Sequence, residues 1–146
     1  MPTPTQYQQT QVMTASPMEL IIMMYDECIT TLDRADKAFE LEGGDRIQAL
    51  NNTVLHAEDI IAELAVSLDM EKGGEIAKNL HRLYDFMIYH LSQGNINQNR
   101  KCIADVRKMM AEMREAWQKV YEHECETGRA EPEQASTGRS SICVNG

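Results

Sequence analysis

Proline is missing from the interior of this chain. All four prolines lie near the ends, at positions 2, 4, 17 and 132, so residues 18–131 contain no helix breaker. Aromatic residues, which favour strands, make up only 5% of the sequence, and Ala, Leu, Met, Glu, Gln and Lys dominate its middle. Because these residues favour helices, the composition predicts an all-α protein.

Long apolar runs and clustered positive charge are also missing. No run of 18 apolar residues occurs, and the N-terminus Met-Pro-Thr-Pro-Thr-Gln lacks the positive start and apolar stretch of a secretory signal. With a net charge of −9, the chain is a poor match for nucleic acid or anionic membranes. Its four cysteines form no CxxC pair, which predicts reduced thiols. We therefore expect a cytoplasmic protein that neither binds nucleic acid nor inserts into membranes.

Signatures of catalysis and metal binding are not found. The four histidines show no HExxH or other paired ligand spacing, and no Glu is followed three residues later by His, as a di-iron bundle requires. Gly73-Gly74 lacks the Lys-Ser/Thr of a phosphate loop, and no serine has a Gly-x-Ser-x-Gly context. The sequence thus predicts a protein that is not an enzyme and has neither metal nor cofactor.

Sequence signals for the starts and ends of helices divide the chain into four helical segments. Ser16, Pro17 and Glu19 form a capping box with proline at the first helical position, and we expect this first helix to end at Gly43-Gly44. Asp45 is the predicted cap of the second helix, and Asn97 or Asn99 that of the fourth. The predicted apolar stripes are Ile21, Tyr25, Cys28, Leu32, Ala35 and Phe39; Ile47, Leu50, Val54, Ala57, Ile61, Leu64 and Leu68; Ile76, Leu80, Leu83, Met87 and Leu91; and Ile103, Val106, Met110, Met113, Trp117 and Val120.

Gly73-Gly74 lies between the second and third stripes. Adjacent glycines can adopt the left-handed conformation that ends a helix, so a tight reversal is expected there. Short turns make neighbouring helices antiparallel, which predicts an up-down four-helix bundle over residues 16–126. Residues 1–15 are expected to be a mobile segment, and residues 127–146, rich in Gly, Ser, Thr, Glu and Pro, a disordered tail.

The high methionine content, ten residues, is the most informative feature of the composition. They fill the core in the simplest interpretation, which we expect for Met110 and Met113. However, Ile22-Met23-Met24 and Met109-Met110 spread apolar side chains more widely than one stripe requires. Helices that are apolar over more than one face are either deeply buried or covered by a partner, and flexible thioethers adapt well to a bound peptide. Core filling and a partner groove both remain open on these residues alone.

Two segments together resemble a known family. The first runs from Tyr7 and Val12 through Thr14-Ala-Ser-Pro to Leu20-Ile and Tyr25-Asp26. The second joins residues 60–69 to Gly73-Gly-Glu-Ile-Ala-Lys-Asn-Leu-His-Arg-Leu-Tyr84. In this order they resemble the flagellin-specific export chaperones of bacterial flagella, the FliS family, over roughly residues 7–120. Glu27-Cys28 and Gly94 depart from that family's usual residues, and the tail after Glu126 is not covered.

This resemblance implies a cytoplasmic chaperone that binds the disordered C-terminal segment of flagellin and blocks premature filament assembly. Similar proteins present their cargo to the membrane export gate of the flagellar type III apparatus and interact with other flagellar regulators. Tyr7 and Val12 match a mobile N-terminal motif that can act as a displaceable lid. The partner-binding residues expected from the resemblance are Tyr7, Val12, Leu20, Met24, Tyr25, Asn79, Leu83 and Tyr84.

Alternatives remain for these roles and for the function. Tyr25 and Tyr84 can equally be core aromatics with hydroxyls at the rim, and Asn79 can bond a neighbouring helix or turn. The rival function is a non-enzymatic helical-bundle adaptor or regulator that binds another flagellar or secretion protein. A di-metal enzyme is a distant third, since the paired ligands are missing.

Overall fold

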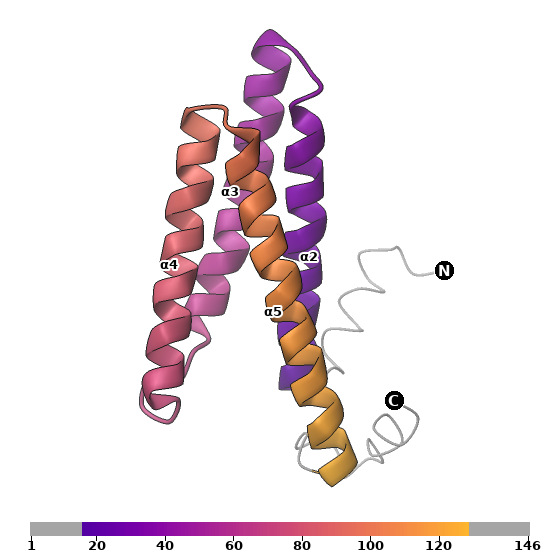
Figure 1. Cartoon of the computed structure of the whole chain (residues 1–146), viewed down its shortest axis with the longest axis vertical. Helices are drawn as coiled ribbons and strands as arrows, with labels where there is room; N and C mark the ends of the chain where they lie inside the picture. The colour runs from indigo at the N-terminus through magenta and orange to yellow at the C-terminus, as the bar shows by residue number, and fades with distance from the viewer. Residues whose placement is uncertain (1–15, 129–146) are drawn as a thin grey trace, which may run out of the picture. The chain divides into compact units, whose positions relative to one another are not determined.

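The structure is a computed structural model that describes residues 16–128. Four helices and no strands occupy these residues: α2 (Pro17–Ala38), α3 (Gly43–Val66), α4 (Gly74–Ile96) and α5 (Arg100–Thr127) (Figure 1). The all-α prediction is thus confirmed. The predicted mobile segment 1–15 and residues 129–146 of the predicted tail lie outside the described part. No described helix is long and apolar enough to cross a membrane.

Two compact units divide the chain, and each is described by itself. Residues 24–112 form the larger unit, which contains parts of all four helices; residues 16–23 and 113–128 belong to the smaller one. In the smaller unit the predicted capping box is present. The Ser16 backbone N–H donates to Glu19 Oε1 and the Glu19 N–H to Ser16 Oγ, both at 3.2 Å. Ser16 and Ile22 are buried there.

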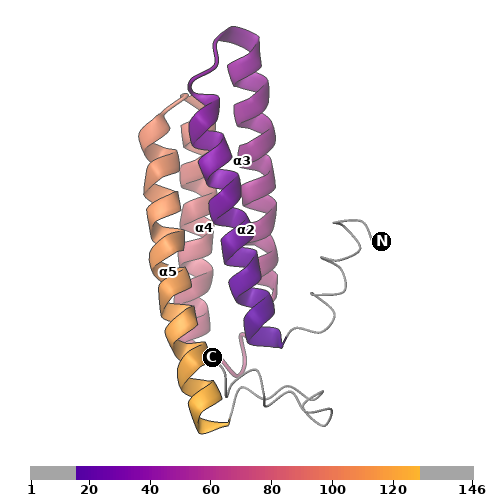
Figure 2. The same cartoon turned by 90° about the vertical axis from the view of Figure 1, so that its right-hand side faces the viewer.

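The larger unit is a four-helix bundle with at least one polar contact across each seam between neighbouring helices. α2 meets α3 through His56 and Glu27, α3 meets α4 through Ser92 and Glu58, α4 meets α5 through His90 and Asp105, and α5 meets α2 through Arg107 and Asp33. The helices therefore follow one another around the bundle in chain order. Figure 2 shows the antiparallel course of successive helices from a second side.

The core of the larger unit follows most of the predicted stripes. Most of its members have no exposed surface. They are Tyr25, Cys28, Leu32, Ala35 and Ala38 of α2, with Phe39 directly after it; Leu50, Val54, Ala57, Ile61 and Leu64 of α3; Ala77, Tyr84, Met87 and Leu91 of α4; and Cys102, Ile103, Val106 and Met110 of α5. Several predicted stripe residues are outside this core. In the larger unit Ile47 is 55% exposed and Ile76 is 73% exposed, while Leu68, Leu80 and Leu83 are half-buried. In the smaller unit Ile21, Met113 and Trp117 are half-buried and Val120 is 42% exposed.

Two predicted helix boundaries are wrong. α2 ends at Ala38 instead of at Gly43-Gly44, and Gly43 begins α3. Asp45 lies within the first turn of α3, and Glu42 is the residue that precedes the helix. By contrast, Asn99 caps α5 as predicted, because its Oδ1 accepts the Lys101 N–H at 3.0 Å. Asn97 instead ends α4.

The double glycine serves the turn between α3 and α4 in two different ways. Gly74 begins α4 with a φ of +54°, in the left-handed region that favours glycine. Gly73 has an ordinary φ of −78° but no room for a side chain, since a Cβ would lie 2.5 Å from the Ala77 Cβ and 2.7 Å from the Asp69 carbonyl oxygen. Asp69 organises the turn: its Oδ1 accepts the backbone N–H groups of Glu71 and Lys72.

Gly94 has a comparable role where α4 approaches α5. A Cβ there would lie 2.7 Å from the Cys102 Cβ and 3.3 Å from the Ile103 Cδ1. A residue with a side chain could not occupy this position without moving one of the helices. The missing Cβ therefore sets the distance between α4 and α5 beside their connecting turn.

Gly73→Ala should destabilise the protein by about 1–3 kcal/mol, because the new methyl group overlaps both backbone and a Cβ that cannot rotate away. Gly44→Ala is the matched control. It also lies at the start of a helix, but no atom comes within 4 Å of its added Cβ, so the free energy of unfolding should stay the same or rise. Urea unfolding followed by circular dichroism measures both. Equal loss in the two variants would contradict the crowding at Gly73.

Candidate partner-binding site

Tyr25 and Tyr84 form a polar contact inside the core. Their side chains are 0% and 1% exposed, and their hydroxyl oxygens are 2.5 Å apart. Because α2 and α4 are not neighbours around the bundle, this hydrogen bond spans it diagonally. Burial raises the pKa of Tyr84, although the hydrogen bond with Tyr25 opposes that rise. Neither ring reaches the surface in this structure, and their predicted part in partner binding stays a prediction.

Cys28 lies one helical turn after Tyr25 and is also fully buried. Burial, with a smaller effect of the neighbouring Glu27 carboxylate, raises the pKa of its thiol to about 12. The thiol is therefore protonated at neutral pH and points at the Ala57 carbonyl oxygen, 3.9 Å away. The prediction of reduced thiols is confirmed for Cys28 and Cys102, and it is wrong for Cys125, which is disulfide-bonded.

One side of α4 carries apolar side chains outside the core. Ile76, Leu83 and Phe86 follow one another at helical spacing, together with Asn79, and we call these four residues the α4 strip. Ile76 is 73% exposed and Phe86 48% exposed, whereas Leu83 is half-buried. Asn79 is exposed, and its side-chain oxygen accepts a hydrogen bond from Arg82. The predicted site residues Asn79 and Leu83 thus share this surface.

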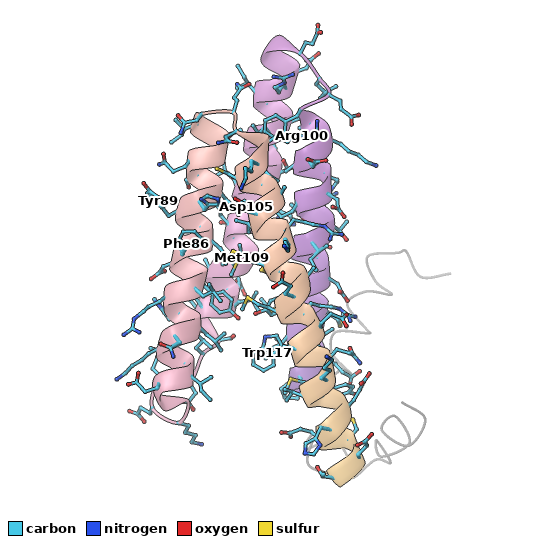
Figure 3. All side chains as sticks on the ribbon, viewed as in Figure 1. Phe86, Tyr89, Arg100, Asp105, Met109 and Trp117 are labelled. Carbon is cyan, nitrogen blue, oxygen red and sulfur yellow. The ribbon has the colours of Figure 1, made fainter. Side chains whose placement is uncertain are left out.

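His90 shows which way the α4 strip faces. Its ring stacks on Phe86, with 5.2 Å between the ring centroids, and its Nε2 lies 3.1 Å from Asp105 Oδ2 on α5. The α4 strip therefore lies on the α5 side of α4. Figure 3 shows Phe86 on α4 together with Asp105 and the half-buried Met109 on α5. The hydrogen bonds from His90 and from Lys101 hold the pKa of Asp105 below its usual range.

A groove between α2 and α3 lies on the other side of the bundle. It has a volume of about 390 Å³ and is lined by Met24, Glu27, His56, Asp59, Ile60 and Glu63. Met24 and Ile60 are half-buried and form its apolar part, while the ionisable residues surround them. The predicted site residue Met24 thus belongs to a different surface from Asn79 and Leu83. We call this cavity the α2–α3 groove.

The remaining predicted site residues lie elsewhere. Leu20 is half-buried on α2 within the smaller unit, and Tyr7 and Val12 are outside the described residues. Among the methionines, Met110 is fully buried, as expected, whereas Met113 is only half-buried. The methionine excess therefore divides between the core and half-exposed positions. Within residues 16–128, no group of three or more His, Cys, Asp or Glu side chains could hold a metal ion.

Comparison with known proteins identifies the family. The model of the family described as "Flagellar protein FliS" matches residues 2–124. The Flagellar secretion chaperone FliS of Salmonella typhimurium is 41% identical over 113 residues, covering 77% of this chain and 82% of the relative. The FliS chaperone of Bacillus subtilis is 32% identical over 120 residues, with 82% and 86% covered. That of Vibrio cholerae is 33% identical over 111 residues, with 76% and 79% covered.

The chain belongs to the FliS family. The resemblance on the Thr-Ala-Ser-Pro and double-glycine segments is thus confirmed, and the family is one of flagellar secretion chaperones rather than of enzymes. In this FliS chain, the α4 strip and the α2–α3 groove are two surfaces that combine apolar and polar side chains outside the core. Both lie in the larger unit, where every lining side chain comes from a helix that the core holds in place.

Sequence reasoning missed several residues of these surfaces. Phe86 lies three residues after Leu83, a helical spacing that could have revealed the α4 strip, but Leu83 had been placed in the core stripe. Ile60, Asp59 and Glu63 of the α2–α3 groove gave no such signal, because their pairing with Met24 depends on how α2 packs against α3.

The buried tyrosine pair gives a testable prediction for this FliS protein. Tyr84→Phe should lower the free energy of unfolding at pH 7 by about 1 kcal/mol, because the bond to Tyr25 is lost. Tyr89→Phe is the matched control, since Tyr89 is 63% exposed on the same helix, and it should change stability by less than about 0.5 kcal/mol. Denaturant unfolding measures both, and an equal effect would contradict a stabilising role of the pair.

The same variant tests the pKa of Tyr84. Because the folded pKa is raised, the stabilisation from Tyr84 is complete below its ordinary pKa of about 10 and is lost as the pH rises through the folded value. Wild type should therefore lose more stability between pH 8 and pH 11 than Tyr84→Phe does. Ionisation of Cys28 contributes equally to both proteins and cancels in the comparison.

Proposed function

We propose that this FliS chain is a cytoplasmic export chaperone that binds the disordered C-terminal segment of flagellin. Binding prevents premature polymerisation, and the complex assists delivery of flagellin to the membrane export gate of the flagellar type III export apparatus. The observation that carries the proposal is the α4 strip, a line of half-exposed to exposed apolar side chains on a folded bundle whose relatives are named flagellar secretion chaperones.

The spacing of the α4 strip fits a helical cargo. An amphipathic helix binds a groove through apolar residues on one side, and Ile76, Leu83 and Phe86 offer it apolar contacts along one side of α4, with the amide of Asn79 between them. A disordered segment that folds on binding can cover a long surface of this kind, although the ordering of its chain lowers its affinity. Covering Phe86 and Ile76 removes apolar surface from water, which provides the driving force.

Ile76 allows a closely matched test of this cargo surface. Ile76→Ser should raise the Kd for a flagellin C-terminal peptide about tenfold, or ~1.4 kcal/mol, because an apolar contact is lost. Ile96→Ser is the control. Ile96 lies on the same helix with the same 73% exposure, but helical spacing places it roughly a third of a turn around α4 from the centre of the α4 strip. Isothermal titration calorimetry measures both affinities.

Three outcomes of this titration are distinguishable. Weakening by Ile76→Ser alone supports the α4 strip, whereas equal effects of both variants would show that the peptide does not use this side of α4. If wild type fails to bind the peptide at concentrations of tens of micromolar but binds another flagellar or secretion protein, the chain is the adaptor or regulator of the rival reading. Both substituted side chains are largely exposed, so the fold should tolerate either change.

The N-terminal residues provide a second test of the proposal. We propose that residues 1–15, with Tyr7 and Val12, act as a displaceable lid that competes with cargo. Deleting residues 1–15 should then lower the Kd for the flagellin peptide, since cargo no longer displaces a competing segment. The full-length Tyr7→Ser/Val12→Ser variant should reproduce the gain if these two side chains are the anchors. Weaker or unchanged affinity in both variants would count against the lid.

A further inference from the structure

We infer that the α2–α3 groove is a docking site for a second polypeptide, a basic amphipathic helix that belongs to neither this chain nor another copy of it. The groove combines an apolar centre with an acidic surround. Its centre is formed by Met24 and Ile60, which are half-buried and face each other from neighbouring helices. Such a centre accepts a large apolar side chain from a partner.

The charges around the groove determine the chemistry of its occupant. Three carboxylates, Glu27, Asp59 and Glu63, line it beside the single imidazole of His56. Glu27 is already compensated, because it lies 3.3 Å from His56 Nε2 and 3.7 Å from Arg34 Nη2. Asp59 and Glu63 form no ion pair with a residue in the described range 16–128. They are therefore available to Lys or Arg side chains of a partner.

The spacing of these residues favours a helical partner. Asp59, Ile60 and Glu63 occur within one turn of α3, so an apolar position lies between two acidic ones. A helix lying along the groove would place a Leu or Met into the apolar centre and the Lys or Arg residues of the next turns beside the carboxylates. A compact ligand with a single charge would use only part of this arrangement.

The sequence argues against segments of this chain and against a second copy as occupants. Residues 1–15 contain no Lys or Arg, so they have no cationic side chain to pair with the free carboxylates. Residues 129–146 contain two arginines and two glutamates, which leaves them without net charge. A second copy would bring a net charge of −9 to an acidic surface and would be repelled. Charge complementarity thus selects a separate, basic polypeptide.

The site is distinct from the proposed cargo surface. The α2–α3 seam and the α4–α5 seam lie on opposite sides of the bundle, as the polar contact across each seam shows. The inference therefore goes beyond flagellin binding and does not depend on it. A partner in the α2–α3 groove would leave the α4 strip uncovered.

The test uses the full chain and a fluorescent amphipathic peptide with a leucine stripe flanked by lysines. The peptide should bind in 50 mM NaCl and more weakly in 300 mM NaCl, since salt screens the carboxylates. Replacing each lysine by glutamate in the peptide should abolish binding. The double variant Asp59→Asn/Glu63→Gln should weaken binding at least fivefold. Fluorescence anisotropy reports each affinity.

Matched variants separate the groove from general charge. Glu71→Gln/Glu112→Gln makes the same change in net charge at exposed sites outside the groove and should alter the affinity by less than twofold. Met24→Gln removes apolar character at nearly constant size and should also weaken binding. The proposal would be overturned if Glu71→Gln/Glu112→Gln lost as much affinity for the peptide as Asp59→Asn/Glu63→Gln does. It would also be overturned if Met24→Gln bound the peptide with unchanged affinity.

An NMR titration of wild type keeps the proposal falsifiable if a variant folds poorly. Addition of the leucine–lysine peptide should shift backbone amide resonances of residues 56–63 in α3 and of Met24 and Glu27 in α2. Shifts confined to other parts of the chain would show that the peptide binds elsewhere and would overturn the assignment of the α2–α3 groove.

Discussion

The hydrogen bond between Tyr25 and Tyr84 constrains the whole larger unit, because it joins two helices that are not neighbours. The hydrophobic effect that holds neighbouring helices together is non-directional. A directional contact between two buried hydroxyls allows only one relative height of α2 and α4. Once that height is set, α3 and α5 occupy the two remaining positions in the bundle. Their contacts with α2 and α4 are then determined. Both surface features described above depend on this register.

The four seams of the bundle are held by different kinds of contact. The backbones of α3 and α4 approach more closely than those of any other pair in the described chain, and short polar side chains such as Asn51, Asn95 and Ser92 meet there. The α2–α5 seam is bridged by exposed ion pairs, including a two-bond contact from Arg100 that lowers the pKa of Asp36. Exposed pairs of this kind stabilise little and weaken in salt. The closely packed α3–α4 seam thus lies opposite the α2–α5 seam, whose exposed ion pairs weaken as ionic strength rises.

The sequence predicted the architecture well, since periodic patterns report directly which side of a helix is buried. The α3 stripe from Leu50 to Leu64 and the capping box at Ser16 are where the pattern placed them. Helix ends were harder to predict, because they depend on contacts that no periodicity encodes. The turn around Asp69 and the start of α3 at Gly43 are examples. The surfaces were hardest, since Met24 and Ile60 come together only after α2 and α3 have packed.

Gly94 links this packing to the seam that carries the α4 strip. With no Cβ at this position, α4 and α5 come together beside their turn, and the α4 strip lies farther along the same seam. A methyl group at position 94 would overlap the Cys102 Cβ and act as a wedge at that end of the seam. The absence of one methyl group therefore allows the close approach of α4 and α5, and any side chain there would displace one of these two helices.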